Sequence, residues 1–312
     1  MAPPSAAEAA IPGVSTRPTE CADEGRDPGC PCAPPAAIRV VEQWVQEQGG
    51  TPPAAPAAAP AAAPAAAPAA APTAAPEALP AGALRVAAQL LHCGTEACVL
   101  AHPRLQQHAR RHGGLQALTA ALASSFKPRG PRDTTDWLSD RDVDRVLEMW
   151  GRRFPRFYPC PYAMMDFEEQ GQALSTLRLA DLAARQFTSL GCVLNTDTSR
   201  GPGRHWVALY LDLAAGQVEY FDSVGAPPMR PVVRWMERRR AELRALRGAP
   251  GGDPRAVVVT RVRHQRSNTE CGLYSLYYIR CRLEGRPPEW FMDRPIPDSV
   301  MRDFRKHVFR GS

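Results

Sequence analysis

The sequence predicts an α+β domain that follows a proline-rich and helical N-terminal region. Apolar residues recur at helical spacing through residues 82–150, whereas short runs rich in β-branched and aromatic residues follow from residue 191 onward. A sheet interrupted by helices, coming after a set of helices, is typical of the α+β class. An Ala/Pro tract at residues 51–81 separates this part from the first 50 residues, which excludes one uniform globule of all 312 residues.

Residues 1–50 are expected to form an arm segment that is partly disordered. Residues 1–34 are rich in Pro, Ala and small polar residues, which bury little apolar surface. Apolar residues at helical spacing predict a short amphipathic helix over residues 38–48, and Gly49-Gly50 ends it.

Residues 51–81 are predicted to be a linker. Proline recurs there at a strict period of four, at Pro52, Pro56, Pro60, Pro64, Pro68, Pro72, Pro76 and Pro80. Each proline removes a helical hydrogen bond and biases the residue before it toward extended angles. The alanines therefore cannot form a continuous helix, and a semi-rigid, polyproline-like spacer is expected.

Residues 82–130 are predicted to form a helical arm, with helices over 84–91 and 115–126. A Pro- and Gly-containing break over 127–135 separates this arm from a further helix over 140–150. We assign residues 131–312 to the α+β domain itself.

Four strands are predicted in the α+β domain. They cover residues 191–194, 205–211, 218–221 and 256–262. An Arg-rich helix over 231–247 lies between the last two strands, and an apolar helix over 272–283 follows them.

The positive charge of the chain allows two interpretations. The net charge is +6, but beyond residue 81 the chain has 35 basic and 24 acidic residues, a net of +11. This excess, with Arg238-Arg239-Arg240, could give weak association with nucleic acid or an acidic particle core. The alternative is a solvated helix face in an Arg-rich chain, since 36 of the 38 basic residues are Arg. A phosphate-binding loop motif is absent from the sequence.

Nine cysteines are an odd number without a dense framework, so we expect free thiols rather than disulfides. Cys93, Cys98 and His102 could be considered metal ligands, but their spacing fits no common zinc module, and buried packing thiols are the better interpretation. We therefore expect neither a metal nor a cofactor. The sequence has no apolar run of 18 residues and no N-terminal leader pattern, so neither a membrane span nor secretion is expected.

Four candidate catalytic residues lie at the ends of predicted elements. His205 opens a strand, and Asp222 follows the next strand. Gln265 and Cys271 lie where the last strand leads into a helix. Catalysis by a thiol has four requirements: a thiolate, a base that generates it, a group that orients the base, and donors for the oxyanion.

These residue types match the four requirements. A helix N-terminus favours the thiolate of Cys271. His205 could accept its proton, and Asp222 could fix the imidazole tautomer. Gln265 could be one oxyanion donor, with the Cys271 amide as the second. Taken singly, each residue is more often structural, and composition does not show that they meet in space.

Several motifs resemble the adenain and SUMO-deconjugating group of cysteine proteases. The order is His-Trp at 205–206, an Asp 17 residues later, a Gln, and Cys-Gly at 271–272; Trp137-Leu138-Ser139-Asp140 resembles a segment that precedes the first core helix of the group. The match is closer still to the thiol proteases of large nucleocytoplasmic DNA viruses. The stretches that carry this closer resemblance are residues 98–103, 128–132, 160–168, 191–197, 233–238, 264–278 and 304–310.

The resemblance covers roughly residues 82–312 and implies a papain-type α+β core with a helical N-terminal arm. It implies a cysteine endopeptidase that cuts after Gly-Gly in viral core polyproteins during virion maturation, in the host cytoplasm and the virion core. Trp206 would then wall a narrow channel for the glycines of the substrate. The typical member of the viral branch has Asn where this chain has Asp222. The wider protease group has Asp at this position, as this chain does.

Three rival functions remain open from the sequence. The first is deconjugation of host ubiquitin-like modifiers, and the second is acetyl transfer through a similar Cys and His. The third is a non-enzymatic, Arg-rich core-binding protein. Gly49-Gly50 could also be a self-cleavage site, although a simple helix stop is the better interpretation.

Overall fold

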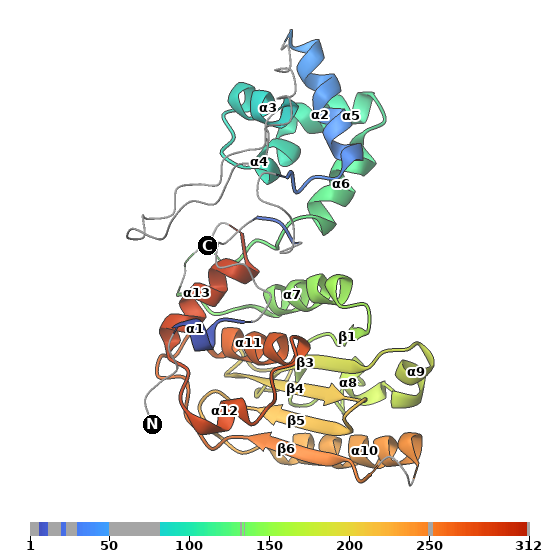
Figure 1. Ribbon diagram of the computed structural model, residues 1–312, viewed down its shortest axis with the longest axis vertical. Coiled ribbons are helices and arrows are strands. Elements are labelled where there is room, and N and C mark those ends of the chain that lie inside the picture. The colour runs from blue at the N-terminus through green and yellow to red at the C-terminus, as the bar shows by residue number, and fades with distance from the viewer. Residues whose placement is uncertain are drawn as a thin grey trace, which may run out of the picture. The chain divides into compact units, whose positions relative to one another are not determined.

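The computed structural model describes residues 6–11, 20–22, 30–49, 82–131, 133, 135–248 and 252–310. Its contacts divide the chain into two compact units (Figure 1). The described residues from 20 to 126 form the arm unit, and those from 127 to 310, together with residues 6–11, form the sheet unit. The linker predicted over residues 51–81 lies outside the described residues, as does Gly50.

The arm unit is built from short helices around one apolar core. They are α2 (Pro35–Glu47), α3 (Ala83–Leu91), α4 (Glu96–Ala101), α5 (Pro103–Arg111) and α6 (Leu115–Ser124). Trp44, Leu100 and Leu105 are among the buried side chains of this core. The helices predicted around residues 38–48, 84–91 and 115–126 are confirmed. Helices α4 and α5 were not predicted, because α4 has only six residues and α5 is mostly polar; each begins at a local cap, Thr95 or His102.

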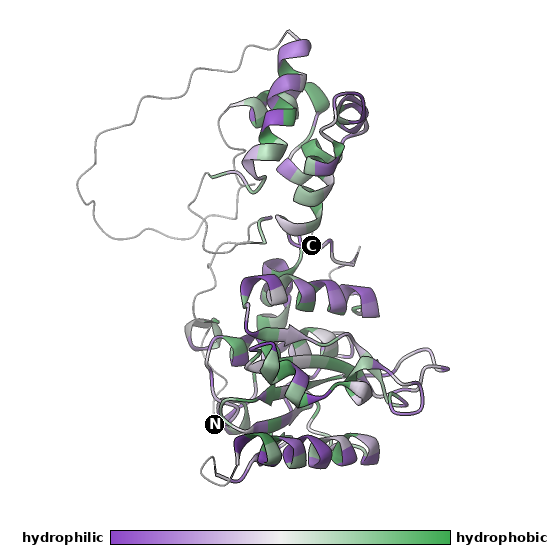
Figure 2. Ribbon diagram, turned by 90° about the vertical axis from the view of Figure 1, so that its right-hand side faces the viewer, coloured by the Kyte–Doolittle hydropathy of each residue, from purple (hydrophilic) through white to green (hydrophobic). Residues whose placement is uncertain are grey.

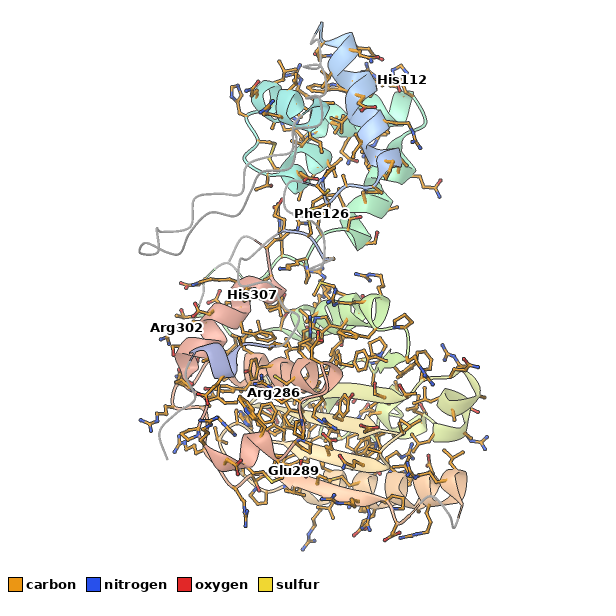
Figure 3. All side chains as sticks on the ribbon, viewed as in Figure 1. His112, Phe126, Arg286, Glu289, Arg302 and His307 are labelled. Carbon is orange, nitrogen blue, oxygen red and sulfur yellow. A yellow bond between two sulfur atoms is a disulfide. The ribbon has the colours of Figure 1, made fainter. Side chains whose placement is uncertain are left out.

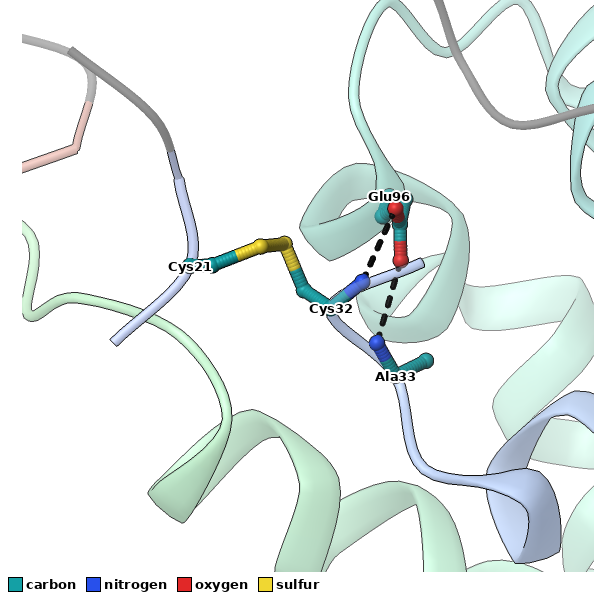
Figure 4. The surroundings of a disulfide bond; sticks show 4 residues. All are labelled: Cys21, Cys32, Ala33 and Glu96. Carbon is teal, nitrogen blue, oxygen red and sulfur yellow. Dashed lines mark hydrogen bonds between the residues drawn. A yellow bond between two sulfur atoms is a disulfide. The ribbon is translucent and has the colours of Figure 1, made fainter. Parts of the chain in front are cut away.

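The expectation of free thiols is wrong for four of the nine cysteines. Disulfides join Cys21 to Cys32 and Cys93 to Cys98, both within the arm unit. The bonded residues are only 11 and 5 positions apart, but cysteine spacing alone does not specify which residues pair. The Glu96 carboxylate also accepts the backbone N–H groups of Cys32 and Ala33, both at 3.1 Å (Figure 4).

The sheet unit contains a mixed six-stranded sheet. Its strands are β1 (Phe157–Pro159), β2 (Ala163–Met164), β3 (Ser189–Asn195), β4 (Trp206–Asp212), β5 (Gln217–Phe221) and β6 (Arg255–Val259). The order is β1-β3-β4-β5-β6, and β2 also pairs with β3. Strands β3, β4 and β5 are mutually antiparallel, whereas β1 and β2 run parallel to β3, and β6 runs parallel to β5. The four predicted strands are confirmed; β1 and β2 are too short to show a sequence period.

Helices cover both faces of the sheet. The first layer contains α8 (Ala173–Thr176), α9 (Leu179–Ala184) and α10 (Arg230–Arg247), and the second contains α7 (Asp140–Arg153) and α11 (Cys271–Leu283) (Figure 1). Apolar side chains of β3, β4 and β5 alternate toward the α10 layer, where Trp235 lies in the shared core. Figure 2 shows the apolar colouring concentrated on the sheet and hydrophilic colouring along α7 and α10. The Arg-rich helix thus buries one apolar stripe and exposes most of its charge.

Helix α11 is the central element of the sheet unit. Residues 271–282 are all buried, and the helix packs across β4. The chain then continues through α12 (Trp290–Asp293) and α13 (Asp298–Val308). A helix buried on all sides has no amphipathic stripe, which is why its full extent depends on tertiary packing rather than on sequence period.

The N-terminal helix α1 (Ala6–Ala9) also packs in the sheet unit. Tyr277 donates its hydroxyl hydrogen to the Ala9 carbonyl, and Arg286, labelled in Figure 3, donates to the carbonyls of Glu8 and Ala10. Residues 6–11 therefore differ from the predicted division, which assigned them to the arm. Among the described residues, no helix has the length and apolar character needed to cross a membrane.

Candidate active site

Cys271 is the first residue of α11, and its side chain is buried. Glu270 precedes it, accepts the Tyr274 backbone N–H at 2.9 Å, and is itself held by the hydroxyls of Ser267 and Thr269. The partial positive charge of a helix N-terminus stabilises an anion at this position. The structure therefore places Cys271 in the first turn of a helix, the position that the sequence predicted for it.

His205 and Asp222 meet at adjoining ends of two neighbouring inner strands of the sheet. His205 directly precedes β4, Asp222 directly follows β5, and these strands are antiparallel neighbours in which Ala208 pairs with Phe221. The beginning of β4 therefore lies beside the end of β5. Nε2 of His205 is 2.9 Å from Oδ1 of Asp222.

Hydrogen bonds orient the buried carboxylate of Asp222. Oδ1 accepts the Val224 backbone N–H at 2.8 Å. The single hydrogen of the Tyr220 hydroxyl is shared between Oδ2 and the Ala226 carbonyl, each 3.3 Å away. Burial, together with the neighbouring Asp222, raises the pKa of Tyr220, so its hydroxyl keeps its proton and donates. A buried carboxylate needs such donors to remain ionised.

The environment of His205 makes it a strong base. Burial alone would lower its pKa, but hydrogen bonds and charge from Asp222 and Cys271 raise the pKa of His205 to about 9. Because Nε2 faces Asp222, Nδ1 is the ring atom left for the thiol. His205 is therefore an imidazolium at neutral pH, positioned between a carboxylate and a cysteine sulfur.

Gln265 lies in the loop between β6 and α11, and its side chain is buried. Its Oε1 accepts the Ser223 hydroxyl at 2.8 Å, and its Nε2 donates to the Ser267 carbonyl at 3.0 Å. Its connection to the other site residues therefore runs through Ser223, the neighbour of Asp222.

Trp206 is the first residue of β4 and is buried. Its indole Nε1 donates to the Leu138 carbonyl at 3.1 Å, and the Tyr162 ring lies edge-on to it. A methyl group added at Gly272 would lie only 3.1 Å from Cδ1 of Leu138, so this leucine also covers the first turn of α11. Leu138 thus links the indole to the helix that begins at Cys271.

A hydrogen bond joins His205 to Asp222 and another joins Ser223 to Gln265, while Cys271 is near enough to His205 to raise its pKa. The sequence prediction missed Tyr220 and Ser223 as partners of these residues. Ser223 follows Asp222 directly, but the Asp-Ser pair alone is equally typical of an ordinary turn. Its contact with Gln265 bridges 42 positions and depends on how β6 and its following loop pack.

Cys93 and Cys98 form a disulfide, so they are not metal-binding thiolates. In the described part of the chain, one group of three potential ligands comes together, Glu47, His108 and His112. Nδ1 of His108 lies 3.1 Å from the Glu47 carboxylate, and the imidazole of His112, labelled in Figure 3, stacks on the His108 ring at 4.4 Å. These groups lie in the arm unit, where Glu47 pairs with Nδ1 of His108 while the buried Nε2 of His108 has no hydrogen-bond partner among the described residues.

Comparison with known proteins defines the family. The sequence profile of the Ulp1 protease family, C-terminal catalytic domain, matches residues 193–310. A cysteine protease of African swine fever virus is 38% identical over 237 residues, which cover 71% of this chain and 85% of that protein. The chain belongs to the Ulp1-type cysteine proteases.

Two further relatives agree with this family. A crystal structure of the African swine fever virus protease superposes with a TM-score of 0.73 at 28% identity, covering 97% of this chain and all of that one. A thiol protease of Acanthamoeba polyphaga mimivirus is 23% identical over 191 residues, which cover 61% of this chain and 62% of that protein. The predicted resemblance and the adenain/SUMO-protease-like α+β fold are confirmed, and this Ulp1-type protein is a viral thiol protease.

Proposed function

We propose that this protein is a cysteine endopeptidase that cleaves after Gly-Gly in viral core polyprotein precursors during virion maturation. The observation that carries the chemistry is the position of His205, whose Nε2 bonds Asp222 at 2.9 Å while the Cys271 thiol raises its pKa from the other side. This arrangement supports a thiolate–imidazolium pair.

In the proposed reaction, the Cys271 thiolate attacks the carbonyl carbon of the scissile peptide bond. His205, already protonated, donates its Nδ1 proton to the leaving amine, and a thioester with Cys271 remains. The neutral imidazole then takes a proton from water, which attacks the thioester and releases the new carboxylate. Asp222 keeps the ring oriented throughout and stabilises its charged form.

Oxyanion stabilisation is assigned to Gln265 and the backbone amide of Cys271. Gln265 Nε2 has two hydrogens, and the Ser267 carbonyl takes one of them. The second hydrogen, together with the amide at the start of α11, supplies two donors for the tetrahedral intermediate.

The Gly-Gly preference is assigned to the channel beside Trp206. The indole of Trp206 is held by its hydrogen bond to the Leu138 carbonyl and by the Tyr162 ring, so the channel wall that it forms is rigid. Residues without side chains are the ones that pass a rigid aromatic wall next to a nucleophile. Viral polyprotein precursors with Gly-Gly sites are therefore the proposed partners.

We place the enzyme in the host cytoplasm and the virion core, where such precursors are processed. The Arg-rich surface of α10 supports a weak association with nucleic acid or an acidic core. Several of its arginines are already paired, Arg234 and Arg238 with Glu168 and Arg244 with Asp253, which limits this contribution.

Deconjugation of ubiquitin-like modifiers is the second candidate, because a 37% identical relative from African swine fever virus is described as a SUMO-1 cysteine protease. A panel that contains a linear internal Gly-Gly peptide and a modifier with a C-terminal fluorophore separates the two. The maturation role requires faster cleavage of the linear site.

The direct test incubates the wild-type protein and Cys271→Ala with the core precursors of the same virus. The proposal requires cleavage after Gly-Gly by the wild type alone, identified by N-terminal sequencing of the products. Equal processing by both proteins would contradict it.

A further inference from the structure

We infer that Ser223 is a positioning residue that holds the Gln265 carboxamide in its oxyanion-donating orientation. This inference rests on the oxyanion role proposed above for Gln265. The same turn then sets two parts of the site, because Ser223 is peptide-bonded to Asp222.

Three hydrogen bonds connect Ser223 to the loop that carries Gln265. The Ser223 carbonyl accepts the backbone N–H groups of His264 at 2.8 Å and Gln265 at 2.9 Å. The Ser223 hydroxyl donates to Gln265 Oε1 at 2.8 Å. Both side chains are almost fully buried, with 1% and 2% exposed, so water does not compete for these bonds.

The direction of the carboxamide follows from these partners. The two ends of a carboxamide have nearly the same shape, so only hydrogen-bond partners distinguish them. The Ser267 carbonyl can only accept, which places Nε2 beside it and Oε1 on the opposite side. The Ser223 hydroxyl is the donor that makes this Oε1 position favourable. Rotation of the amide would turn an oxygen toward the oxyanion and repel it.

The hydroxyl of Ser223 acts on Gln265 without holding Asp222. The Asp222 carboxylate is bonded by His205, Val224 and Tyr220, and none of these bonds uses the Ser223 hydroxyl. Removing that hydroxyl should therefore weaken oxyanion stabilisation and leave the thiolate–imidazolium pair intact. A general structural defect would affect both.

The test compares wild type with Ser223→Ala in three measurements. The first is kcat and KM on a fluorogenic linear Gly-Gly peptide and on a ubiquitin-like modifier that ends in Gly-Gly and carries a C-terminal fluorophore. The second is inhibition by a peptide aldehyde ending in Gly-Gly, which forms a tetrahedral adduct. The third is the rate of Cys271 alkylation by iodoacetamide across pH. We expect kcat and aldehyde affinity to fall by roughly 10- to 100-fold, with KM and the alkylation profile unchanged within about twofold.

Two variants serve as controls. Ser223→Thr keeps a hydroxyl and should restore most of the lost kcat. Ser175→Ala removes a hydroxyl of the same unit that donates to the Gln172 carbonyl at 2.8 Å, far along the chain from the site, and should change none of the three measurements.

A double-mutant cycle with Gln265→Ala completes the test. If Ser223 acts through Gln265, then Ser223→Ala causes no further loss in the Gln265→Ala background. The inference is wrong if Ser223→Ala keeps kcat while Gln265→Ala lowers it, or if alkylation and kcat fall together. Unchanged kcat of Gln265→Ala on both substrates would instead remove the oxyanion role itself. Wild-type cleavage of the modifier but not of the linear peptide would remove only the proposed preference for linear precursors.

Discussion

Nε2 of His205 and Oδ1 of Asp222 lie 2.9 Å apart, and this contact fixes which ring nitrogen faces Cys271. It exists because β4 begins where the antiparallel strand β5 ends. The position of each residue is therefore set by strand register, and a shift of one residue would turn either side chain to the other face of the sheet.

The first prediction concerns the alkaline limit of activity. The raised pKa of His205 keeps the imidazolium present up to about pH 9, so activity should fall only as pH rises through that value. In Asp222→Asn, the ring loses its anionic partner, the pKa of His205 falls, and the alkaline limb of kcat/KM moves to lower pH. We expect a loss of about 10- to 100-fold in kcat/KM at pH 7, because an Asn oxygen still accepts the ring N–H.

A pH–rate profile of both proteins checks this prediction. Tyr220→Phe provides a milder comparison, since it removes one donor to Asp222 and leaves the carboxylate charge in place. An alkaline limb that is identical in wild type and Asp222→Asn would contradict the assigned partnership.

The second prediction concerns Gly272. Its Cβ position is 3.1 to 3.3 Å from side-chain atoms of Leu138, so in Gly272→Ala the leucine must give way by a few tenths of an ångström. We expect a loss of about 1–3 kcal/mol in the free energy of unfolding and a lower kcat. Chemical denaturation and kinetics measure both effects.

Trimming the partner provides the control for this contact. Leu138→Ala creates the space that the new methyl group needs, so the double variant should be more stable than the sum of the single losses predicts. If the losses in unfolding free energy of the two single variants simply add, the methyl group at position 272 and Leu138 do not clash.

The third prediction concerns acid stability. Burial lowers the pKa of His264 to about 4, and its Nδ1 accepts the Ile296 N–H at 3.1 Å. In the unfolded chain His264 is protonated below about pH 6.5, whereas in the folded protein it stays neutral down to about pH 4. The free energy of unfolding should therefore fall as pH drops from 6.5 toward 4. This one group contributes up to about 3 kcal/mol over that window.

His264→Asn keeps an acceptor for Ile296 without a titrating ring. Although this variant is less stable at pH 7, its unfolding free energy should depend less on pH between 6.5 and 4. Denaturation midpoints across that range test it, and parallel pH curves for the two proteins would show that His264 is not the source.

The fourth prediction concerns the arm. Opening the disulfide between Cys21 and Cys32 releases a loop of 11 positions, which should cost about 2–3 kcal/mol of arm stability. Glu96→Gln should add to the loss, because a neutral amide accepts the N–H groups of Cys32 and Ala33 less strongly than a carboxylate.

Thermal unfolding with and without reductant, monitored through Trp44 of the arm core, measures the effect. Cys30→Ser is the matched control, since Cys30 is an exposed free cysteine in the same region. A melting temperature that reductant does not change would contradict the stabilising role of the disulfides.

The sequence predicted the strands and helices that carry the site because each is a distinct apolar or alternating run bounded by turn residues. Strands β3 to β6 are apolar or alternating, and Cys271 comes at the start of a long apolar segment. The pairs Cys21–Cys32 and Cys93–Cys98 were not predicted, since cysteine spacing alone does not specify a partner. The short strands β1 and β2 exist only because β3 offers an edge to pair with.

Within the site, residue type and position at element ends, together with the family resemblance, made His205, Asp222, Gln265 and Cys271 the candidate residues. What sequence could not provide is the set of contacts around them. The bond from Ser223 to Gln265 and the bond from Trp206 to the Leu138 carbonyl span 42 and 68 positions. Such long-range contacts follow from packing rather than from any local pattern.

The most direct test of the account is covalent labelling with a peptide that ends in Gly-Gly and carries an electrophilic vinyl ester in place of the scissile bond. Mass spectrometry of the digested adduct should place one label per molecule on Cys271, and His205→Ala should slow labelling by at least about 100-fold. Labelling of another cysteine such as Cys30, or labelling of Cys271 at an unchanged rate without His205, would contradict the account.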